Sequence, residues 1–178
     1  MINIKTNRLI LRNFQKKDAH GLFEYLANPR SACFLDEKID SIKQAVDYIN
    51  QINTCPEETN IAVCTKGNDL LIGNIFSQKE IPDTYGVGWH FNKNYEGKGY
   101  ATEAATAYID FLFTHKNARR IYAYVEENNI RSKKLCERLG MRQEGLFLDF
   151  VSFTKDINGI SIYENTFIYA ILKKEWNK

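Results

Sequence analysis

The sequence predicts a mixed α+β fold in which one mainly antiparallel sheet of about seven strands is flanked by about four helices. Strand-like segments meet across turn-forming residues at 66–69 and again at 156–159, as they do in hairpins. Between these hairpins, two strand-like segments are each followed by a segment of helical period, as in crossover connections. Because the strand–helix alternation is not continuous, neither a barrel nor a regular doubly wound sheet is favoured.

The first part of the chain alternates strand and helix signals. Arg8–Phe14 is rich in leucine and isoleucine and is expected to be a strand. Asp18 is predicted to cap a helix that runs to about Ala27 and is stopped by the proline at 29. Ser41, with Gln44 three residues later, forms a capping-box pattern that opens a second helix to about Ile52.

The rest of the chain supplies the hairpins and crossovers. The turn at 66–69 joins strands Ile61–Thr65 and Leu70–Ser77, and Val87–Phe91 is a further strand. After it we expect, in order, helix 99–116, strand 121–125, helix 129–139 ended by Gly140, and a final hairpin of strands 145–153 and 160–171.

The composition excludes several classes of protein. A chain of 178 residues is about one domain's worth, and no repeat or linker interrupts it, so residues 1–178 are expected to form a single domain. The formal charge of +2 does not favour nucleic-acid binding, and no apolar run is long enough to cross a membrane. The four cysteines and three histidines lack metal-ligand spacing, and the N-terminus does not resemble a signal peptide. We therefore expect free thiols, no metal and a cytoplasmic location.

A glycine-rich segment follows the strand that ends at Phe91 and opens the helix at 99–116. Backbone N–H groups at a helix start are unpaired and carry the positive end of the helix dipole, so they can bind phosphate oxygens. Gly97 and Gly99 would let the backbone approach such an anion closely. The P-loop and dinucleotide fingerprints are absent, and the alternative is a loop that only connects strand to helix.

The segment resembles motif A of the GNAT N-acetyltransferase superfamily, because Gly97-Lys98-Gly99 precedes Tyr-Ala-Thr-Glu-Ala. Asn94 stands where the family pattern has glutamine or arginine. Thr6–Arg12 followed by Asp18-Ala19 and Gly73 in the first hairpin resemble the ribosomal-protein alanine N-acetyltransferase (RimJ/RimL-type) branch. The same branch is also resembled by Asn129–Ser132 and by the segment from Leu139 to Gly145. Together these matches run from Thr6 to Gly145 in the order of the family. The resemblance implies a GNAT-type fold.

The resemblance also implies acetyl-CoA as cosubstrate, with its pyrophosphate on the glycine loop and its pantetheine beside a strand that splays from its neighbour. The residues implied are Trp89, His90 and Phe91, mainly through their backbone, and Asn94, Tyr95, Glu96, Gly97, Lys98, Gly99, Tyr100, Ala101 and Thr102 in the loop and the helix start. Asn129 and Ser132 would contact the pantetheine, although Asn129 also suits a helix cap. Lys134 shares a basic helix face with Arg131 and Arg138, which suits phosphates or simply solvent.

The catalytic groups are harder to assign. Ser132 is the expected proton donor to the leaving thiolate, and Cys136, at the position of the tyrosine of many GNAT enzymes, is the alternative or a small buried apolar residue. The carboxylate that the branch often carries before the glycine loop is missing from Gly86–Trp89. Asp149, with Glu80 second, is the candidate base, and a base-free mechanism through water stays open.

The expected function is acetyl-CoA-dependent transfer of an acetyl group to a primary amine, by direct attack in a ternary complex. The resemblance implies that loops 29–40 and 54–60 border the acceptor entrance. They carry Phe34, Asp36, Glu37, Glu57 and Glu58. Such acidic loops suit a cationic acceptor, which leaves open a protein N-terminus (of a ribosomal protein, by resemblance), a polyamine or a small-molecule amine. The alternative is an acetyl-CoA-binding regulatory module with little catalysis. A homodimer is allowed, and no membrane or nucleic-acid partner is expected.

Overall fold

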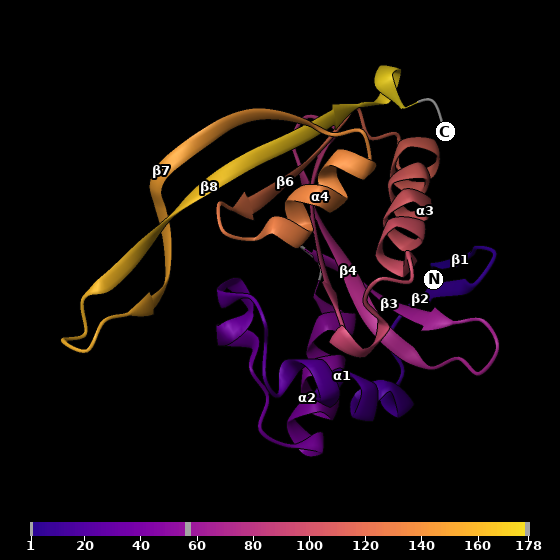
Figure 1. Cartoon of the computed structure of the whole chain (residues 1–178). Helices are drawn as coiled ribbons and strands as arrows, with labels where there is room; N and C mark the ends of the chain where they lie inside the picture. Colours follow the sequence, from indigo (N-terminus) through magenta and orange to yellow (C-terminus); the bar gives the residue numbers. More distant parts are fainter. Residues whose placement is uncertain (1, 56–57, 177–178) are drawn as a thin grey trace.

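The computed structural model describes residues 2–55 and 58–176. One eight-stranded sheet in the order β1-β2-β3-β4-β5-β6-β8-β7 runs through the molecule (Figure 1). All neighbours are antiparallel except β5 and β6, which are parallel. The strands are β1 (Asn3–Lys5), β2 (Leu9–Arg12), β3 (Glu58–Thr65), β4 (Leu71–Glu80), β5 (Thr84–Phe91), β6 (Arg120–Glu126), β7 (Arg142–Lys155) and β8 (Ser161–Leu172). The predicted GNAT-type mixed sheet is confirmed, with one strand more than the seven expected.

Helices cover both faces of the sheet and bury its apolar side chains. The helices are α1 (Ala19–Leu26), α2 (Ile42–Thr54), α3 (Tyr100–His115) and α4 (Ile130–Arg138), with a 3-10 helix η2 (Ala32–Glu37) between α1 and α2. One core cluster joins α3 and α4 to the sheet, and its fully buried Tyr108 donates to or accepts from the Ser77 hydroxyl. A second, smaller cluster joins α1 and α2 to the opposite face. Four helices of these lengths match the sequence prediction.

The sheet divides between β5 and β6. These strands pair only over Thr84–Gly86 and Arg120–Tyr122, and beyond that point each keeps only its antiparallel partner. β5 remains paired with β4 as far as Phe91, and β6 with β8 as far as Glu126. The expectation that the Val87–Phe91 strand splays from its neighbour is therefore confirmed. The opening places backbone and side chains from both halves around a shared wedge.

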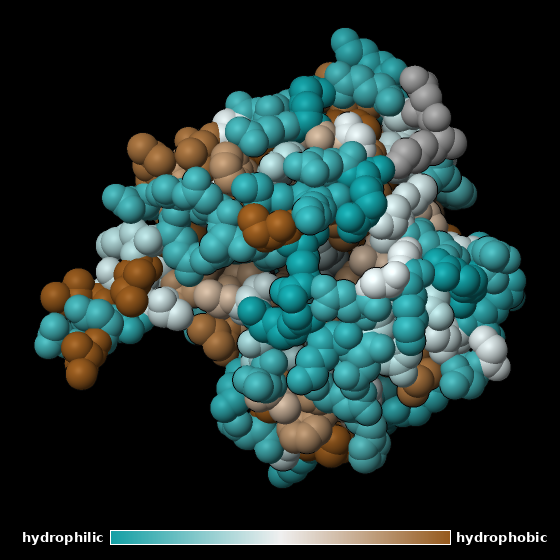
Figure 2. Space-filling view, viewed as in Figure 1, coloured by the Kyte–Doolittle hydropathy of each residue, from teal (hydrophilic) through white to brown (hydrophobic). Residues whose placement is uncertain are grey.

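β7 and β8 extend beyond the body of the molecule as a long hairpin (Figure 1). Bulges interrupt the pairing at three places along β7, which forms the edge of the sheet. Apolar side chains gather on this arm (Figure 2), among them Leu146, Phe147, Leu148, Phe150, Ile157, Ile160, Ile162 and Tyr163. Among the described residues, no helix is both long and apolar enough to cross a membrane.

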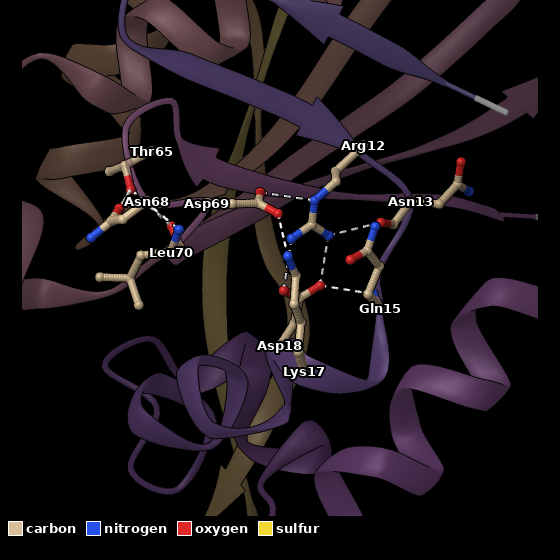
Figure 3. A network of polar contacts seen from close by, with 9 residues as sticks. All are labelled: Arg12, Asn13, Gln15, Lys17, Asp18, Thr65, Asn68, Asp69 and Leu70. Atoms are coloured by element: carbon tan, nitrogen blue, oxygen red, sulfur yellow. Dashed lines mark hydrogen bonds and ion pairs between the residues drawn. The ribbon is translucent and has the colours of Figure 1, made fainter.

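The first strand and the first helix differ from the sequence predictions. The predicted strand Arg8–Phe14 is shorter, at Leu9–Arg12, and the extra strand β1 pairs with it. Asp18 stands at the N-cap position of α1, as predicted, but its side chain makes no cap hydrogen bond there. Its carboxylate instead accepts two hydrogen bonds from the Arg12 guanidinium, of 2.7 and 2.9 Å, and one from the Gln15 N–H at 2.7 Å (Figure 3). Ser41 does cap α2, accepting from the Gln44 N–H at 3.2 Å.

Candidate active site

The glycine-rich segment forms a loop that exposes backbone N–H groups at the start of α3. Asn92 begins it by accepting the Asn94 N–H at 3.0 Å, and a short 3-10 turn, η3 (Lys93–Tyr95), follows. Gly97 and Gly99 have φ of +76° and +77°, a conformation that strains other residues. Because α3 has sixteen residues, its full dipole points at this loop. The arrangement fits a diphosphate.

A clamp from the N-terminal segment fixes this loop. The Glu103 carboxylate accepts the Thr6 hydroxyl at 2.6 Å, the Arg8 backbone N–H at 2.9 Å and the Arg8 Nε at 2.6 Å. Arg8 also donates to the Lys98 carbonyl at 2.9 Å and lies over the Tyr100 ring. Burial acts to raise the pKa of Glu103, but the hydrogen bonds from Thr6 and Arg8 outweigh it and lower that pKa. The Thr6–Arg12 segment therefore positions the phosphate loop.

A groove of about 610 Å³ starts at this loop and follows β5 and α4. The predicted cofactor residues that line it are Trp89, His90, Phe91, Tyr95, Glu96, Gly97, Gly99, Ala101, Thr102, Asn129, Ser132 and Lys134. Asn94, Lys98 and Tyr100 belong to the loop but do not line the groove. The structure thus gathers twelve of the fifteen predicted cofactor residues around one space.

The wall of the groove is cationic. Its basic side chains include Arg30, Arg131, Lys134 and Arg138. All of these except Arg30 belong to the predicted basic face of the helix. Glu96 bridges this wall, accepting from Arg30 at 2.7 Å and from Arg131 at 2.5 Å. These two hydrogen bonds hold the pKa of Glu96 below its usual value. Arg30, in the loop after α1, was missed because no motif marks it.

Asn129 and Ser132 lie at the start of α4, where the sequence pattern places them. The Asn129 side chain accepts the Ser132 N–H at 3.2 Å, which confirms its capping role. The Trp89 indole crosses from β5 and donates its N–H to the Ser132 hydroxyl at 3.2 Å. Because this bond connects the two halves of the divided sheet, Trp89 and Ser132 stand at the centre of the wedge.

A second cavity, of about 490 Å³, opens on the other side of this centre. It shares Phe34, Trp89, Asn129 and Ser132 with the groove. Its floor contains Gly86 and Gly88, where a Cβ would meet the Tyr122 hydroxyl at 3.0 Å and the Phe76 ring at 2.1 Å. The two spaces therefore meet at the divided sheet. One is lined by the glycine loop and basic side chains, and the other by aromatic rings and carboxylates.

The carboxylates of this second cavity are Glu37, Glu58, Glu80 and Glu126. Glu37 and Glu58 belong to the loops that were expected to border the acceptor entrance, whereas Glu57 lies outside the described residues and Asp36 does not line the cavity. Burial raises the pKa of both Glu37 and Glu58. Glu126, only 8% exposed, was missed because it lies in an ordinary apolar strand pattern.

Two of the predicted catalytic residues, Cys136 and Asp149, lie away from this centre. Cys136 is fully buried in the core, lines neither cavity, and its pKa is raised to about 12 by burial. Asp149 is exposed on the β7 arm at a φ of +46° and lines neither cavity. His90 lies in the groove wall, stacked on Phe34 at 4.2 Å, and burial lowers its pKa to about 4. The structure brings Ser132 to the centre but not Cys136 or Asp149. Among the described residues, no group of three metal-type side chains comes together.

Comparison with known proteins decides the family. The family model of the acetyltransferase (GNAT) domain matches residues 8–142. The chain belongs to the GNAT acetyltransferase family. It is therefore an N-acetyltransferase of the acetyl-CoA-dependent type, and the sequence resemblance to GNAT motif A is confirmed.

Relatives of the GNAT chain cover its full length. It is 34% identical to the uncharacterized N-acetyltransferase YnaD of Bacillus subtilis, over 99% of this chain and 100% of that protein. The crystal structure of a GNAT-family acetyltransferase from Bacillus anthracis superposes with a TM-score of 0.85 at 30% identity, covering 98% of this chain and 100% of that one. The [ribosomal protein uS5]-alanine N-acetyltransferase of Escherichia coli is 24% identical over 84% of this chain and 83% of its own length.

Proposed function

We propose that this GNAT chain transfers the acetyl group of acetyl-CoA to a primary amine by direct attack in a ternary complex. The observation that carries the proposal is the meeting of the two cavities at Trp89 and Ser132. A phosphate-binding groove and a carboxylate-lined cavity then present two substrates to one point. Such convergence supplies proximity, which is a large part of catalysis in a two-substrate reaction.

The groove residues have distinct roles in this proposal. The N–H groups from Gly97 to Ala101 bind the diphosphate, whereas those of Tyr95 and Glu96 already donate to the carbonyls of Asn92 and Lys93. The basic side chains of α4, Arg131, Lys134 and Arg138, add charge-assisted contacts. Trp89, His90 and Phe91 offer backbone groups that β6 leaves unpaired on this side of the wedge. The bound cosubstrate supplies the acetyl thioester, and the exposed strand backbone supplies donors for the developing oxyanion.

Ser132 is the group we assign to protonate the leaving thiolate. Its oxygen accepts the Trp89 indole N–H at 3.2 Å, so its own proton is free to point elsewhere. The same bond makes the hydroxyl a better donor by withdrawing charge from its oxygen. Asn129 holds the backbone of Ser132 in place from the helix cap.

The base that takes the proton of the amine is assigned to the acceptor cavity. Glu80 and Glu126 line it, whereas Asp149 does not, so these two carboxylates replace Asp149 as candidates. Glu80 accepts the Tyr122 hydroxyl directly above Gly86, the position at which the branch often carries its carboxylate. The Tyr122 hydroxyl thus occupies the space beside Gly86, and the Glu80 carboxylate from β4 binds that hydroxyl.

The acceptor is a primary amine, with a protein N-terminus, a polyamine and a small-molecule amine as the candidates. The relative that acts on ribosomal protein uS5 supports the N-terminus of a ribosomal protein as one of these candidates. The same relative supports the assignment of this chain to the RimJ/RimL-type branch. The exposed apolar arm of β7 and β8 supports a homodimer. A regulatory module without catalysis is not favoured, because such a module needs no second cavity at the reacting centre.

The test is thiol release from acetyl-CoA with a panel of amines, together with calorimetric binding of acetyl-CoA. Gly97→Ala should weaken acetyl-CoA binding by about tenfold or more, because a Cβ at φ +76° displaces the phosphate-binding amides. Gly159→Ala is the matched control, since Gly159 has φ +79° and equally open space but lies in the β7–β8 turn. Absence of acetyl-CoA binding at millimolar concentration, or equal losses in both variants, would refute the proposal.

A further inference from the structure

The carboxylates of the acceptor cavity have no cationic partner. In the described part of the chain, Glu37, Glu58, Glu80 and Glu126 enter none of the ion pairs, and no lysine, arginine or histidine lines the cavity. Elsewhere carboxylates such as Asp18, Glu96 and Glu144 bind arginine. The cavity thus concentrates negative charge in a protein whose net charge is positive.

Neutral donors hold each of these carboxylates in place. Glu37 accepts the Tyr48 hydroxyl at 2.5 Å, Glu58 the Asn60 side-chain amide, and Glu80 the Tyr122 hydroxyl. Glu126 is flanked by the Asn129 amide at 3.3 Å and by the Cys33 thiol. Fixed orientation without neutralisation is the arrangement expected of groups that wait for a cation, since a buried charge is costly unless it is paired.

The carboxylates come from four different elements. Glu58 is on β3, Glu80 on β4, Glu126 on β6 and Glu37 on η2. The same cavity is lined by aromatic rings, those of Phe34, Phe76, Trp89, Tyr122 and Tyr124. Aromatic faces accept both methylene groups and ammonium groups. A single ammonium cannot neutralise four carboxylates, so the lining suits a chain of methylenes with charges at intervals.

We propose that the acceptor is a linear aliphatic diamine or polyamine, bound with one amine near Glu126 and a second ammonium between Glu37 and Glu58. This inference rests on the proposed function and names the substrate class of the same site. Glu126 neighbours Asn129 at the centre, whereas Glu37 and Glu58 lie toward the η2 and β3 side. A volume of about 490 Å³ falls within the range of small-molecule sites, roughly 300–1,000 Å³.

The reaction balances without a further reagent. The deprotonated primary nitrogen forms a bond to the acetyl carbon, and the carbon–sulfur bond of the thioester breaks. One proton leaves the nitrogen for a cavity carboxylate or water, and one proton reaches the departing sulfur. The products are the monoacetylated amine and coenzyme A, and the second ammonium takes no part except in binding.

The first experiment compares acceptors of matched length. Thiol release is measured with butylamine, 1,4-diaminobutane, spermidine and a peptide with an N-terminal alanine. We expect kcat/KM for the diamine and for spermidine to exceed that for butylamine by about tenfold or more, with an advantage that shrinks as salt is added. Calorimetry with coenzyme A present should show spermidine binding in the absence of turnover.

The second experiment removes the outer charges. Glu58→Gln and Glu37→Gln should raise KM for spermidine about tenfold each, and KM for butylamine by less, because butylamine lacks the second ammonium. Asp47→Asn is the matched control, because Asp47 is an exposed carboxylate of α2 outside the cavity. It should leave every constant unchanged.

The outcomes separate this inference from the proposed function. Equal kcat/KM for butylamine and the diamines, or preference for the peptide, would overturn the polyamine assignment while acetyl transfer stands. Unchanged spermidine kinetics in both glutamate variants would overturn it as well. Binding of acetyl-CoA without thiol release on any amine would overturn both proposals.

Discussion

At the scale of single residues, the Trp89–Ser132 hydrogen bond is the link between the two halves of the sheet. Trp89 comes from β5, which belongs to the half of the sheet that carries the glycine loop, and Ser132 comes from α4 after β6. The contact lies where the groove and the acceptor cavity meet. Ser132 is therefore placed to act on the carbon–sulfur bond of the thioester, which breaks in the proposed reaction.

Ser132→Ala should lower kcat by about 100-fold, because the leaving thiolate loses its proton donor. KM for acetyl-CoA should change little, since the phosphate contacts remain. Stopped-flow thiol release would measure both constants. Ser152→Ala is the control, because its hydroxyl binds only the Thr154 carbonyl on the β7 arm. A kcat equal to that of the unaltered protein would reduce Ser132 to a structural role.

Asp18→Asn should destabilise the fold by about 3 kcal/mol, because it leaves the buried Arg12 guanidinium without its two-point partner. Asp69 still binds Arg12 and limits the loss (Figure 3). Lys17→Ala removes an exposed cation from the same network and should cost at most about 1 kcal/mol. Urea unfolding of each variant measures its loss of unfolding free energy. Equal losses would show that the buried pair contributes no more than the exposed one.

The same residues show how far sequence reasoning reaches. The Asn129 cap and the Ser41 cap were predictable, because each depends on a bond to a residue three positions away. Asp18 carries the same local signal and does stand at the start of α1, but its carboxylate binds Arg12 of β2 and the Gln15 N–H and makes no cap hydrogen bond to α1. A local pattern predicts the position of a cap but does not show which charge on another element competes for its side chain.

At the scale of elements, the clamp around Glu103 joins α3 to the segment before β2. Three hydrogen bonds from Thr6 and Arg8 end on this one carboxylate. Arg8 then passes the constraint to the loop through the Lys98 carbonyl. The resemblance of Thr6–Arg12 to the family therefore has a physical meaning, because this segment shapes the phosphate loop without lining the groove.

Glu103→Gln should destabilise the protein by about 1–2 kcal/mol at pH 7, with the partial exposure of Arg8 limiting the effect. Because the pKa of Glu103 is lowered in the folded state, its contribution is complete above the unfolded pKa of about 4.3. The contribution disappears as the pH falls through the lowered folded pKa. Thermal melts of the variant and of the unaltered protein from pH 7 to pH 3 measure the difference in their stability, which should become smaller at acid pH. A stability difference that does not change with pH would contradict the stabilising role of the ionised Glu103.

The strands show a second limit of sequence reasoning. β1 alternates polar and apolar residues but has only three of them, which is too short a stretch to predict a strand. Its pairing with β2 was therefore not expected. The cofactor groove is built largely from two continuous segments, 89–102 and 129–138, and was largely predictable for that reason. The carboxylates of the acceptor cavity come singly from β3, β4, β6 and η2, and no spacing rule brings them together.

At the scale of the whole molecule, the division of the sheet separates opposite charges. The groove on one side carries arginines and lysine, and the cavity on the other carries only carboxylates as charged groups among the described residues. An overall charge of +2 conceals this separation. The protein can thus attract an anionic cosubstrate and a cationic acceptor to adjoining sites, each by complementary potential.

This separation predicts the pH dependence of acceptor binding. Burial raises the pKa of Glu37 and Glu58, so both lose their charge at a higher pH than the usual glutamate value of about 4.3. Spermidine keeps its full charge over the acid range, so its calorimetric Kd with coenzyme A present should rise as the pH falls toward and through these raised pKa values. Because a bound ammonium lowers both pKa values, binding in that range should release protons, detectable in buffers of different ionisation enthalpy. The Glu37→Gln, Glu58→Gln double variant should show weaker binding that depends less on pH there, since only Glu80 and Glu126 of the cavity carboxylates remain. A Kd for the unaltered protein that stays constant down to pH 4 would contradict the placement of the second ammonium between these carboxylates.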